Sequence, residues 1–223
     1  MSQPPAAWGA NTDDWNGTLR YGPDVADETT LRLCGPLSGK KVLVLGCGAG
    51  QAPVEFARAG ARVIGVEPSA TRVDAARARC TEAGVAVELH RLDLAELAFV
   101  RADTIDLAFS AMQLCGVADP TRVFRQLHRV LRPDGALVCS LPHPAHGLVT
   151  GGTGARYTPN APRPWKNGAE TGEDHGHGIG ALVTAFARTG FRLDALHELD
   201  PAAAVPTVLV LRARKIGALT VNG

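Results

Sequence analysis

The chain has 223 residues, 45% of them hydrophobic and 20% charged, and its formal net charge is +1. This length and composition are typical of one globular domain with a core large enough to need neither disulfides nor a structural metal. The near-neutral charge gives no electrostatic argument for binding nucleic acid or an anionic membrane. Five scattered cysteines without a CxxC pair, no basic-then-apolar leader and no membrane-length apolar run predict a cytoplasmic protein with reduced thiols.

A regular alternation of strand-like and helix-like segments begins at Lys41, after a polar start rich in Pro and Gly. Short apolar runs predict strands, and apolar residues at helical spacing, closed by glycines, predict helices. The expected strands cover 41–46, 62–67, 85–90, 104–110 and 136–141, and the expected helices cover 51–60, 70–84 and 120–132. The tetrapeptide RPDG at 132–135 predicts a turn before the fifth strand.

This alternation predicts βαβ units, and therefore an α/β fold with a doubly wound, mostly parallel sheet and helices on both faces. Residues 142–178 are rich in Pro, Gly and His and show no periodic element, so we expect a long functional loop. A helix at 179–189 follows. The strands expected at 191–199 and 206–214 have no helix between them, which predicts an antiparallel hairpin at the sheet edge.

The stretch VLVLGCGAGQ, residues 42–51, is an apolar strand that leads into a glycine turn. A dinucleotide site prefers the spacing G-x-G-x-x-G, in which the third glycine allows close packing of helix and strand. Here the spacing is G-x-G-x-G and Gln51 stands at the third position, which argues against a nicotinamide cofactor. No Walker-type phosphate loop is present in the sequence. A purely structural tight turn is the alternative.

Two acidic residues follow the next strands. Glu67 ends the second strand, 21 positions after Gly46, where a carboxylate can accept hydrogen bonds from both hydroxyls of a ribose. Asp93, in HRLDLAEL after the third strand, is placed to accept a bond from an adenine amine, with Leu92 and Leu94 flanking the ring. The alternatives are a solvated acid at a strand end for Glu67, and a loop acid or helix cap for Asp93.

Together these segments resemble the class I S-adenosylmethionine-dependent methyltransferases, closely over residues 40–142. The resemblance rests on VLVLGCGAGQAPVEFARAGARVIGVEP, LDLAEL, TIDLAFSAMQL and RVFRQLHRVLRPDGALVCSLPHP. It implies a Rossmann-like, seven-stranded sheet with the last strand antiparallel. It also implies S-adenosyl-L-methionine as the cofactor, with contacts at Gly46, Cys47, Gly48, Gly50, Glu67, Pro68, Asp93, Leu94, Ser110 and Ala111.

The resemblance also divides the chain. NTDDWNGTLRYGPD resembles the lid segment of small-molecule members, so residues 1–40 are expected to cap a methyltransferase domain formed by 41–223. On this resemblance Arg20 and Tyr21 contact the methionine carboxylate. Two alternatives are that Trp15 and Tyr21 only pack against helices, and that the N-terminal segment forms a homodimer contact.

Histidines near the ends of the fourth and fifth strands are candidates for a general base that deprotonates the acceptor. His143 and His146 leave the fifth strand in SLPHPAHG, and His175 and His177 lie in GEDHGHGIG. The alternatives are a turn histidine for His143 and a helix cap for the later pair. A metal cluster of the four is disfavoured, because their spacings lie on loops without a nearby thiolate or carboxylate.

The expected function is therefore methyl transfer from S-adenosylmethionine to a small molecule, with oxygen or nitrogen preferred to carbon as the acceptor atom. SAMQL after the fourth strand lacks the Asn/Asp-Pro-Pro-aromatic pattern of nucleic-acid amine methylases. The first alternative is a protein that binds the cofactor without transferring methyl, or that uses the sulfonium differently. A nicotinamide-dependent reductase is the second.

Overall fold

The computed structural model of the protein describes residues 17–145, 162–167, 170–200 and 205–217, so Trp8, Trp15, His146 and Tyr157 lie outside the described residues. Its elements are, in chain order, α1 (Glu28–Leu31), β1 (Lys41–Leu45), α2 (Gln51–Arg58), β2 (Arg62–Val66), α3 (Ala70–Glu82), β3 (Val87–His90), β4 (Ile105–Ala111), the short 3₁₀ helix η1 (Leu114–Gly116), α4 (Pro120–Val130), β5 (Leu131–Pro142), β6 (Pro162–Asn167), β7 (Glu170–His175), α6 (Ile179–Arg188), β8 (Phe191–Leu199) and β9 (Val208–Lys215). None of the described helices is long and apolar enough to cross a membrane.

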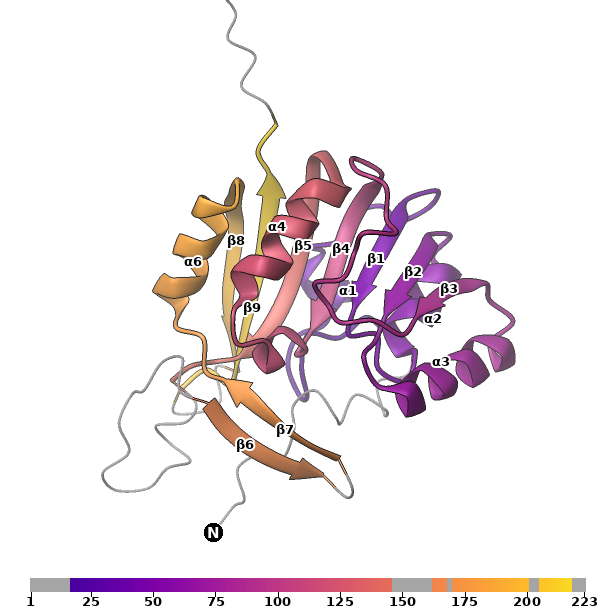
Figure 1. Ribbon diagram of the computed structural model, residues 1–223, viewed down its shortest axis with the longest axis horizontal. Coiled ribbons are helices and arrows are strands. Elements are labelled where there is room, and N and C mark those ends of the chain that lie inside the picture. Colours follow the sequence, from indigo (N-terminus) through magenta and orange to yellow (C-terminus); the bar gives the residue numbers. More distant parts are fainter. Residues whose placement is uncertain (1–16, 146–161, 168–169, 201–204, 218–223) are drawn as a thin grey trace, which may run out of the picture.

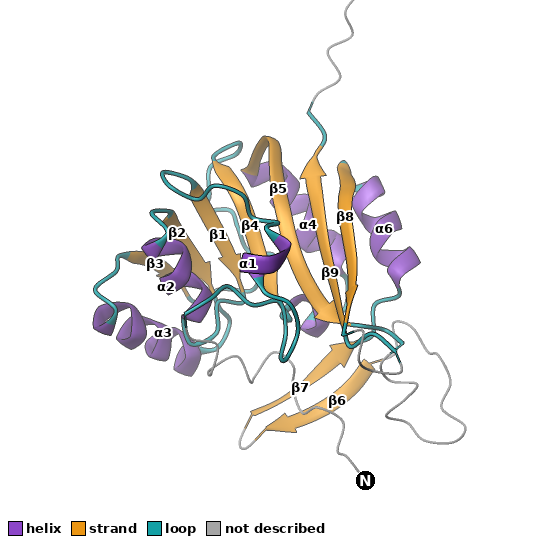
Figure 2. Cartoon of the chain, turned by 180° about the vertical axis from the view of Figure 1, so that it is seen from behind, coloured by secondary structure: helices purple, strands orange, loops and turns teal. Residues whose placement is uncertain are grey.

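Seven strands form one twisted sheet in the order β3-β2-β1-β4-β5-β9-β8. The strands from β3 to β5 are parallel, whereas β9 runs antiparallel to both of its neighbours, β5 and β8. Helices α4 and α6 cover one face of the sheet, and α1 and α2 lie over the other, with α3 beside α2 (Figures 1 and 2). The predicted Rossmann-like fold and the predicted edge hairpin, formed by β8 and β9, are confirmed.

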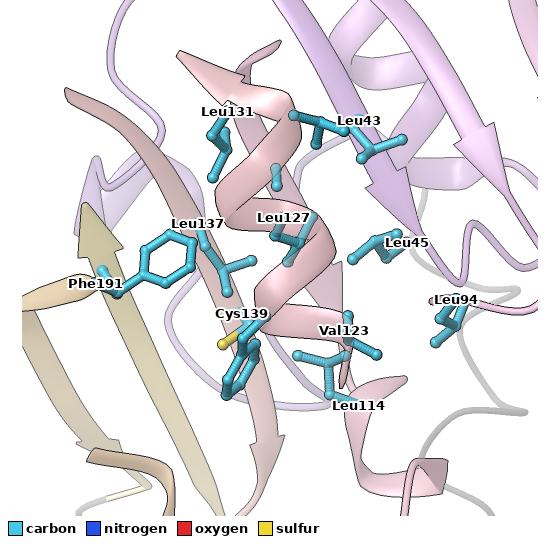
Figure 3. Packing of buried hydrophobic residues seen from close by; sticks show 14 of the residues in the cluster. Leu43, Leu45, Leu94, Leu114, Val123, Leu127, Leu131, Leu137, Cys139 and Phe191 are labelled. Atoms are coloured by element: carbon cyan, nitrogen blue, oxygen red, sulfur yellow. The ribbon is translucent and has the colours of Figure 1, made fainter. Parts of the chain in front are cut away.

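The core is divided between the two faces of the sheet. Helix α4 begins after Asp119, which caps it by accepting a hydrogen bond from the N–H of Thr121 at 2.9 Å. Its apolar residues recur at helical spacing, so Val123 and Leu127 face the sheet toward Leu137 (Figure 3). The apolar side of α4 therefore holds the helix against β5 and leaves its polar side in solvent.

The N-terminal segment packs on the opposite face. Leu19, Tyr21 and Leu33 are buried there against residues of β1, β4 and β9. Gly22 lies so close to this surface that an added Cβ would stand 2.7 Å from Val208 Cγ2. These residues of the N-terminal segment are thus packed onto the sheet.

Two predictions about the second half of the chain are wrong. Residues 142–178 are not without regular structure, since β6 and β7 pair as an antiparallel ribbon outside the main sheet. PRPWKN and ETGEDH lack the alternation of apolar and polar residues that marks a half-buried strand, so their sequences gave no signal. RPDG is not a turn that precedes the fifth strand. It lies within β5 as an irregular stretch, since the pairing register with β4 shifts there: Ile105 pairs with Leu131, but Leu107 pairs with Ala136.

Candidate active site

The glycine turn joins the carboxyl end of β1 to the start of α2. Gly46, Gly48 and Gly50 have φ values of +65°, +53° and +93°, a region that side chains with a Cβ rarely adopt. The N–H groups of Gly46 and Cys47 both donate to the carbonyl of Val66 on β2, at 2.8 and 3.1 Å. The turn is therefore tied to the neighbouring strand.

Close contacts also require two of these glycines. A Cβ on Gly50 would stand 2.9 Å from Cα of Ala76, so this glycine lets α3 approach the turn. A Cβ on Gly46 would stand 2.3 Å from Cγ of Gln113, which follows β4. Gln113 thus lies directly on the glycine turn. Nothing in the local sequence marks this residue beyond its position after a strand of the sheet.

Glu67 holds the turn from the end of β2. Its side chain is only 3% exposed, and its Oε2 accepts a hydrogen bond from the N–H of Gly48 at 3.0 Å. Oε1 accepts from the N–H of Ser69, also at 3.0 Å. Burial, followed by the charge of Glu67, raises the pKa of the Cys47 thiol to about 12, so this thiol is neutral at physiological pH. The structure thus brings together Glu67, Cys47 and Gly48, while Pro68 beside them is exposed.

A small cavity opens where the turn, β4 and the N-terminal segment meet. It is lined by Thr18, Leu19, Arg20, Val44, Gly46, Cys47, Gln51, Ala52, Phe109, Ala111 and Gln113. Nε of Arg20 is buried there, and no described residue supplies it with a hydrogen-bond acceptor. A buried guanidinium donor without a partner is costly, which makes the cavity fit for an anionic group such as a carboxylate.

Tyr21 does not line this cavity. Its ring is fully buried and packs 6.0 Å from the ring of Phe109, and its hydroxyl donates to a carboxylate oxygen of Glu28. Burial raises the pKa of Tyr21 far above its usual value, so the hydroxyl stays protonated. Glu28 also accepts from the N–H groups of Leu33 and Cys34, at 2.9 and 2.8 Å. The contacts favour the packing alternative for Tyr21, whereas Arg20 is placed at the cavity.

The loop after β3 contains two predicted cofactor contacts, Asp93 and Leu94, and they differ in exposure. Asp93 is exposed, and its Oδ1 accepts a hydrogen bond from the N–H of Ala95 at 2.9 Å, which makes it the start of a local turn. Leu94 is buried in the core beside the sheet. The contact of Asp93 with an adenine amine stays a prediction, and Leu94 packs mainly against protein.

The end of β4 carries a backbone feature that the sequence did not reveal. Ala111 lines the cavity, while Ser110 is fully buried and its Oγ finds no hydrogen-bond partner among the described residues. Met112 follows with a φ of +61°, a conformation that is strained for a residue with a side chain. Its N–H donates to the carbonyl of Ser140 at 2.9 Å, and this bond holds the strained turn against the end of β5.

His143 uses both ring nitrogens within the protein. The ring is 5% exposed; Nδ1 accepts from the N–H of Ala145 at 3.2 Å, and Nε2 lies 2.8 Å from Oε1 of Glu198. In the neutral ring, Nε2 therefore donates to the carboxylate. This arrangement ties the exit of β5 to the edge strand β8. A general base needs a nitrogen that faces the acceptor, so the bonds favour the turn-histidine alternative.

His175 and His177 lie together beside η1, with ring centroids 6.0 Å apart. Nε2 of His177 is 2.8 Å from the carbonyl of Val117, and burial lowers the pKa of this ring. His177 is therefore a neutral donor that attaches the start of α6 to η1. The ring of His175 forms no hydrogen bond with another described residue, and its role as a base stays a prediction.

The ribbon of β6 and β7 reaches the same place. The buried thiol of Cys115 lies 3.4 Å from Oδ1 of Asp174 on β7 and 2.8 Å from the carbonyl of Met112. Burial and the charge of Asp174 raise the pKa of this thiol well above its usual value. The ribbon is thus attached to the turn after β4. Within the described part of the chain, no three His, Cys, Asp or Glu residues are grouped to hold a metal ion.

Comparison with known proteins was made on the sequence and on the fold. Residues 43–139 match the family model described as "Methyltransferase domain". The ubiquinone biosynthesis O-methyltransferase of Hahella chejuensis is 36% identical over 104 residues, which are 47% of this chain and 44% of that protein. The corresponding protein of Ralstonia nicotianae is 33% identical over 131 residues, 58% of this chain and 55% of that protein. The chain thus spans about half the length of the curated relatives it matches.

Solved structures show the same fold at low sequence identity. An S-adenosylmethionine dependent methyltransferase from Mesorhizobium loti superposes with a TM-score of 0.64 at 24% identity, covering 81% of this chain and 93% of that one. At this identity, the likeness establishes the architecture and leaves the chemistry to be argued from the site.

Proposed function

We propose that this chain, whose residues 43–139 form a domain of the methyltransferase family, binds S-adenosylmethionine and transfers its methyl group to a small-molecule acceptor. The carrying observation is one meeting point at the carboxyl ends of the strands. There the glycine turn is bonded to the buried carboxylate of Glu67 through Gly48. Beside Gly46 it borders the cavity that holds Nε of Arg20, for which no described residue provides an acceptor. In a doubly wound sheet, this edge is where ligands bind.

Each end of the cofactor has a chemically matched group. Glu67 is an acceptor-only carboxylate beside the turn, which suits the two hydroxyls of a ribose. Arg20 lines the cavity next to Gly46 and supplies a buried cationic donor for a carboxylate. Residues 17–40 would thereby form one wall of the cofactor site, as the predicted lid requires. The cofactor itself supplies a methyl group on a positively charged sulfur, which is already activated for displacement.

The protein's own contribution is alignment and removal of the acceptor's proton. The predicted candidates that the structure describes are His143, His175 and His177. Of these, His175 is the one whose ring forms no hydrogen bond with a described residue. It lies on β7 next to η1. We assign the base to His175, while His143 and His177 fix the surrounding loops. An oxygen acceptor is favoured, because the relatives named above are O-methyltransferases. The chain matches about half of the length of each of them.

A two-step experiment tests this function. Titration calorimetry with S-adenosylhomocysteine measures cofactor-site binding, and transfer of labelled methyl from S-adenosylmethionine is then measured on small phenols, amines and 1,3-dicarbonyl compounds. We expect saturable binding, with transfer to a phenol or an amine. Lack of binding would overturn the proposal, and binding without transfer to any acceptor class would favour the alternative of a non-methylating cofactor protein.

The base is tested separately. His175→Gln should lower kcat by about 10²–10⁴-fold while binding of S-adenosylhomocysteine stays unchanged. His143→Gln is the matched control, because it removes an imidazole that is engaged with Glu198. Equal loss of kcat in both variants, or no loss in His175→Gln, would contradict the assignment.

A further inference from the structure

A second cleft, lined by cationic side chains, lies at the end of the sheet opposite the glycine turn. It is formed where β1, β4 and β5 begin and where β9 ends, under the loop that precedes β1. Its volume is about 280 Å³, and its lining includes Lys40, Arg132, Arg212 and Arg214. We propose that this cleft is a binding site for a small, multiply charged anion of the phosphate-bearing class.

The two arginines of β9 are held in fixed orientations. Nε of Arg212 and Nε of Arg214 donate to the two oxygens of Asp194, at 2.8 and 2.7 Å. Nη1 of each arginine donates to a backbone carbonyl, that of Leu33 at 3.2 Å and that of Asp134 at 3.1 Å. Neither Nη2 forms a hydrogen bond with a described residue, so each guanidinium keeps donors for a ligand. A guanidinium fixed in this way loses little conformational entropy when it binds an oxyanion.

The opposite wall supplies two further cations. Nη2 of Arg132 lies 2.6 Å from Oδ1 of Asp106, and Nζ of Lys40 lies 3.5 Å from the same atom. The side chains of Arg132 and Lys40 are 48% and 40% exposed, whereas that of Asp106 is only 11% exposed. One largely buried carboxylate thus anchors two cationic side chains that are themselves exposed.

Positive charge is in slight excess. Four cationic side chains stand against the three carboxylates of Asp106, Asp134 and Asp194, and each cation shares Asp106 or Asp194 with another cation. The guanidiniums are suited to phosphate oxygens because their planar donors match two oxygens at once. A small ligand is favoured over nucleic acid, since the whole chain carries a formal net charge of only +1.

The proposal is tested with inorganic pyrophosphate as the probe, by titration calorimetry of the full chain at constant ionic strength. We expect saturable binding that Lys40→Gln and Arg214→Gln each weaken about tenfold, as expected for loss of a charged hydrogen bond. Arg77→Gln is the matched control, since it removes the same charge from an exposed ion pair with Asp74 on α3, and it should bind like the wild type.

Circular dichroism of each variant checks the fold, and Lys40→Gln keeps the test valid if Arg214→Gln disturbs the Asp194 pair. Absence of pyrophosphate binding, or equal weakening in the control, would overturn the proposal. Tighter binding of a DNA oligonucleotide than of pyrophosphate would also overturn it. Because the probe is not a cofactor fragment, failure here leaves binding of S-adenosylhomocysteine at the glycine turn unaffected.

Discussion

The carboxylate of Glu67 accepts a hydrogen bond from the backbone N–H of Gly48 across 3.0 Å. The acid at the end of β2 thus fixes the loop at the end of β1, and the two strands present their ends as one surface. Since the same carboxylate also accepts from Ser69, it is held in one orientation by two backbone donors. Any ligand hydroxyl that reaches Glu67 meets an acceptor that needs no rearrangement.

Glu67→Ala should weaken binding of S-adenosylhomocysteine by about 10- to 150-fold, because a charged acceptor is worth about 1.5–3 kcal/mol. The variant should also be less stable, since the N–H groups of Gly48 and Ser69 lose their acceptor. Titration calorimetry measures the first effect and urea unfolding the second. Glu55→Ala on α2 is the control, as its carboxylate contacts Arg58 and not the turn. Wild-type affinity in Glu67→Ala would place the ribose elsewhere.

Gly46→Ala should lower both stability and cofactor affinity. The substitution strains a residue at a φ of +65° and forces its new methyl group onto Gln113. Gly39→Ala is the matched control, because Gly39 has a φ of +74° but nothing within 4 Å of an added Cβ. We expect the control to cost about 1–2 kcal/mol from backbone strain alone, and Gly46→Ala to cost more. Equal free energies of unfolding in the two variants would show that the contact with Gln113 is unimportant.

Stability should fall as the pH drops below neutrality, partly through His177. Burial lowers the pKa of this ring from its usual 6.5, so the unfolded chain takes up a proton that the folded chain resists. The contribution of His177 is complete above about pH 6.5 and is lost as the pH falls toward the folded pKa. His177→Gln should therefore show a shallower decline in urea unfolding free energy over this range. Burial also lowers the pKa of His128, so this residue should still contribute to the pH dependence of the unfolding free energy in the variant. An unchanged slope in His177→Gln would contradict this.

The native protein should react slowly with a thiol reagent at about pH 8, although all five cysteines are free. Cys47, Cys80, Cys115 and Cys139 are buried, and burial raises the pKa of the Cys139 thiol to about 12. Titration with a chromogenic disulfide should reach five equivalents only in guanidinium chloride. Cys34 is partly exposed, but burial and the charge of Glu28 raise the pKa of its thiol well above the usual value, so we expect it to react slowly as well. Rapid reaction of several thiols in the native protein would show that these sites open readily.

Local patterns were enough to predict most of the main sheet. The apolar runs that became β1, β2, β4 and β9 are buried on both faces, and such strands appear in a sequence as continuous hydrophobic segments. The ribbon of β6 and β7 could not be found in this way, because it lies outside the main sheet and its sequence shows no alternation of apolar and polar residues. The bulge in β5 was misread as a turn because Asp134, with a φ of +61°, has the local chemistry of one.

The sequence by itself determined the order of the strands along the chain, the glycine turn and the acid that faces it, because these depend on short-range spacing and on backbone freedom. Only the tertiary structure decided which side chains are still available for chemistry. It showed that His143 is engaged by Glu198, that Tyr21 is turned toward Glu28, and that Nε of Arg20 has no hydrogen-bond partner among the described residues. The physical reason is that a hydrogen bond between residues such as His143 and Glu198, 55 positions apart, is set by packing and leaves no local pattern in the sequence.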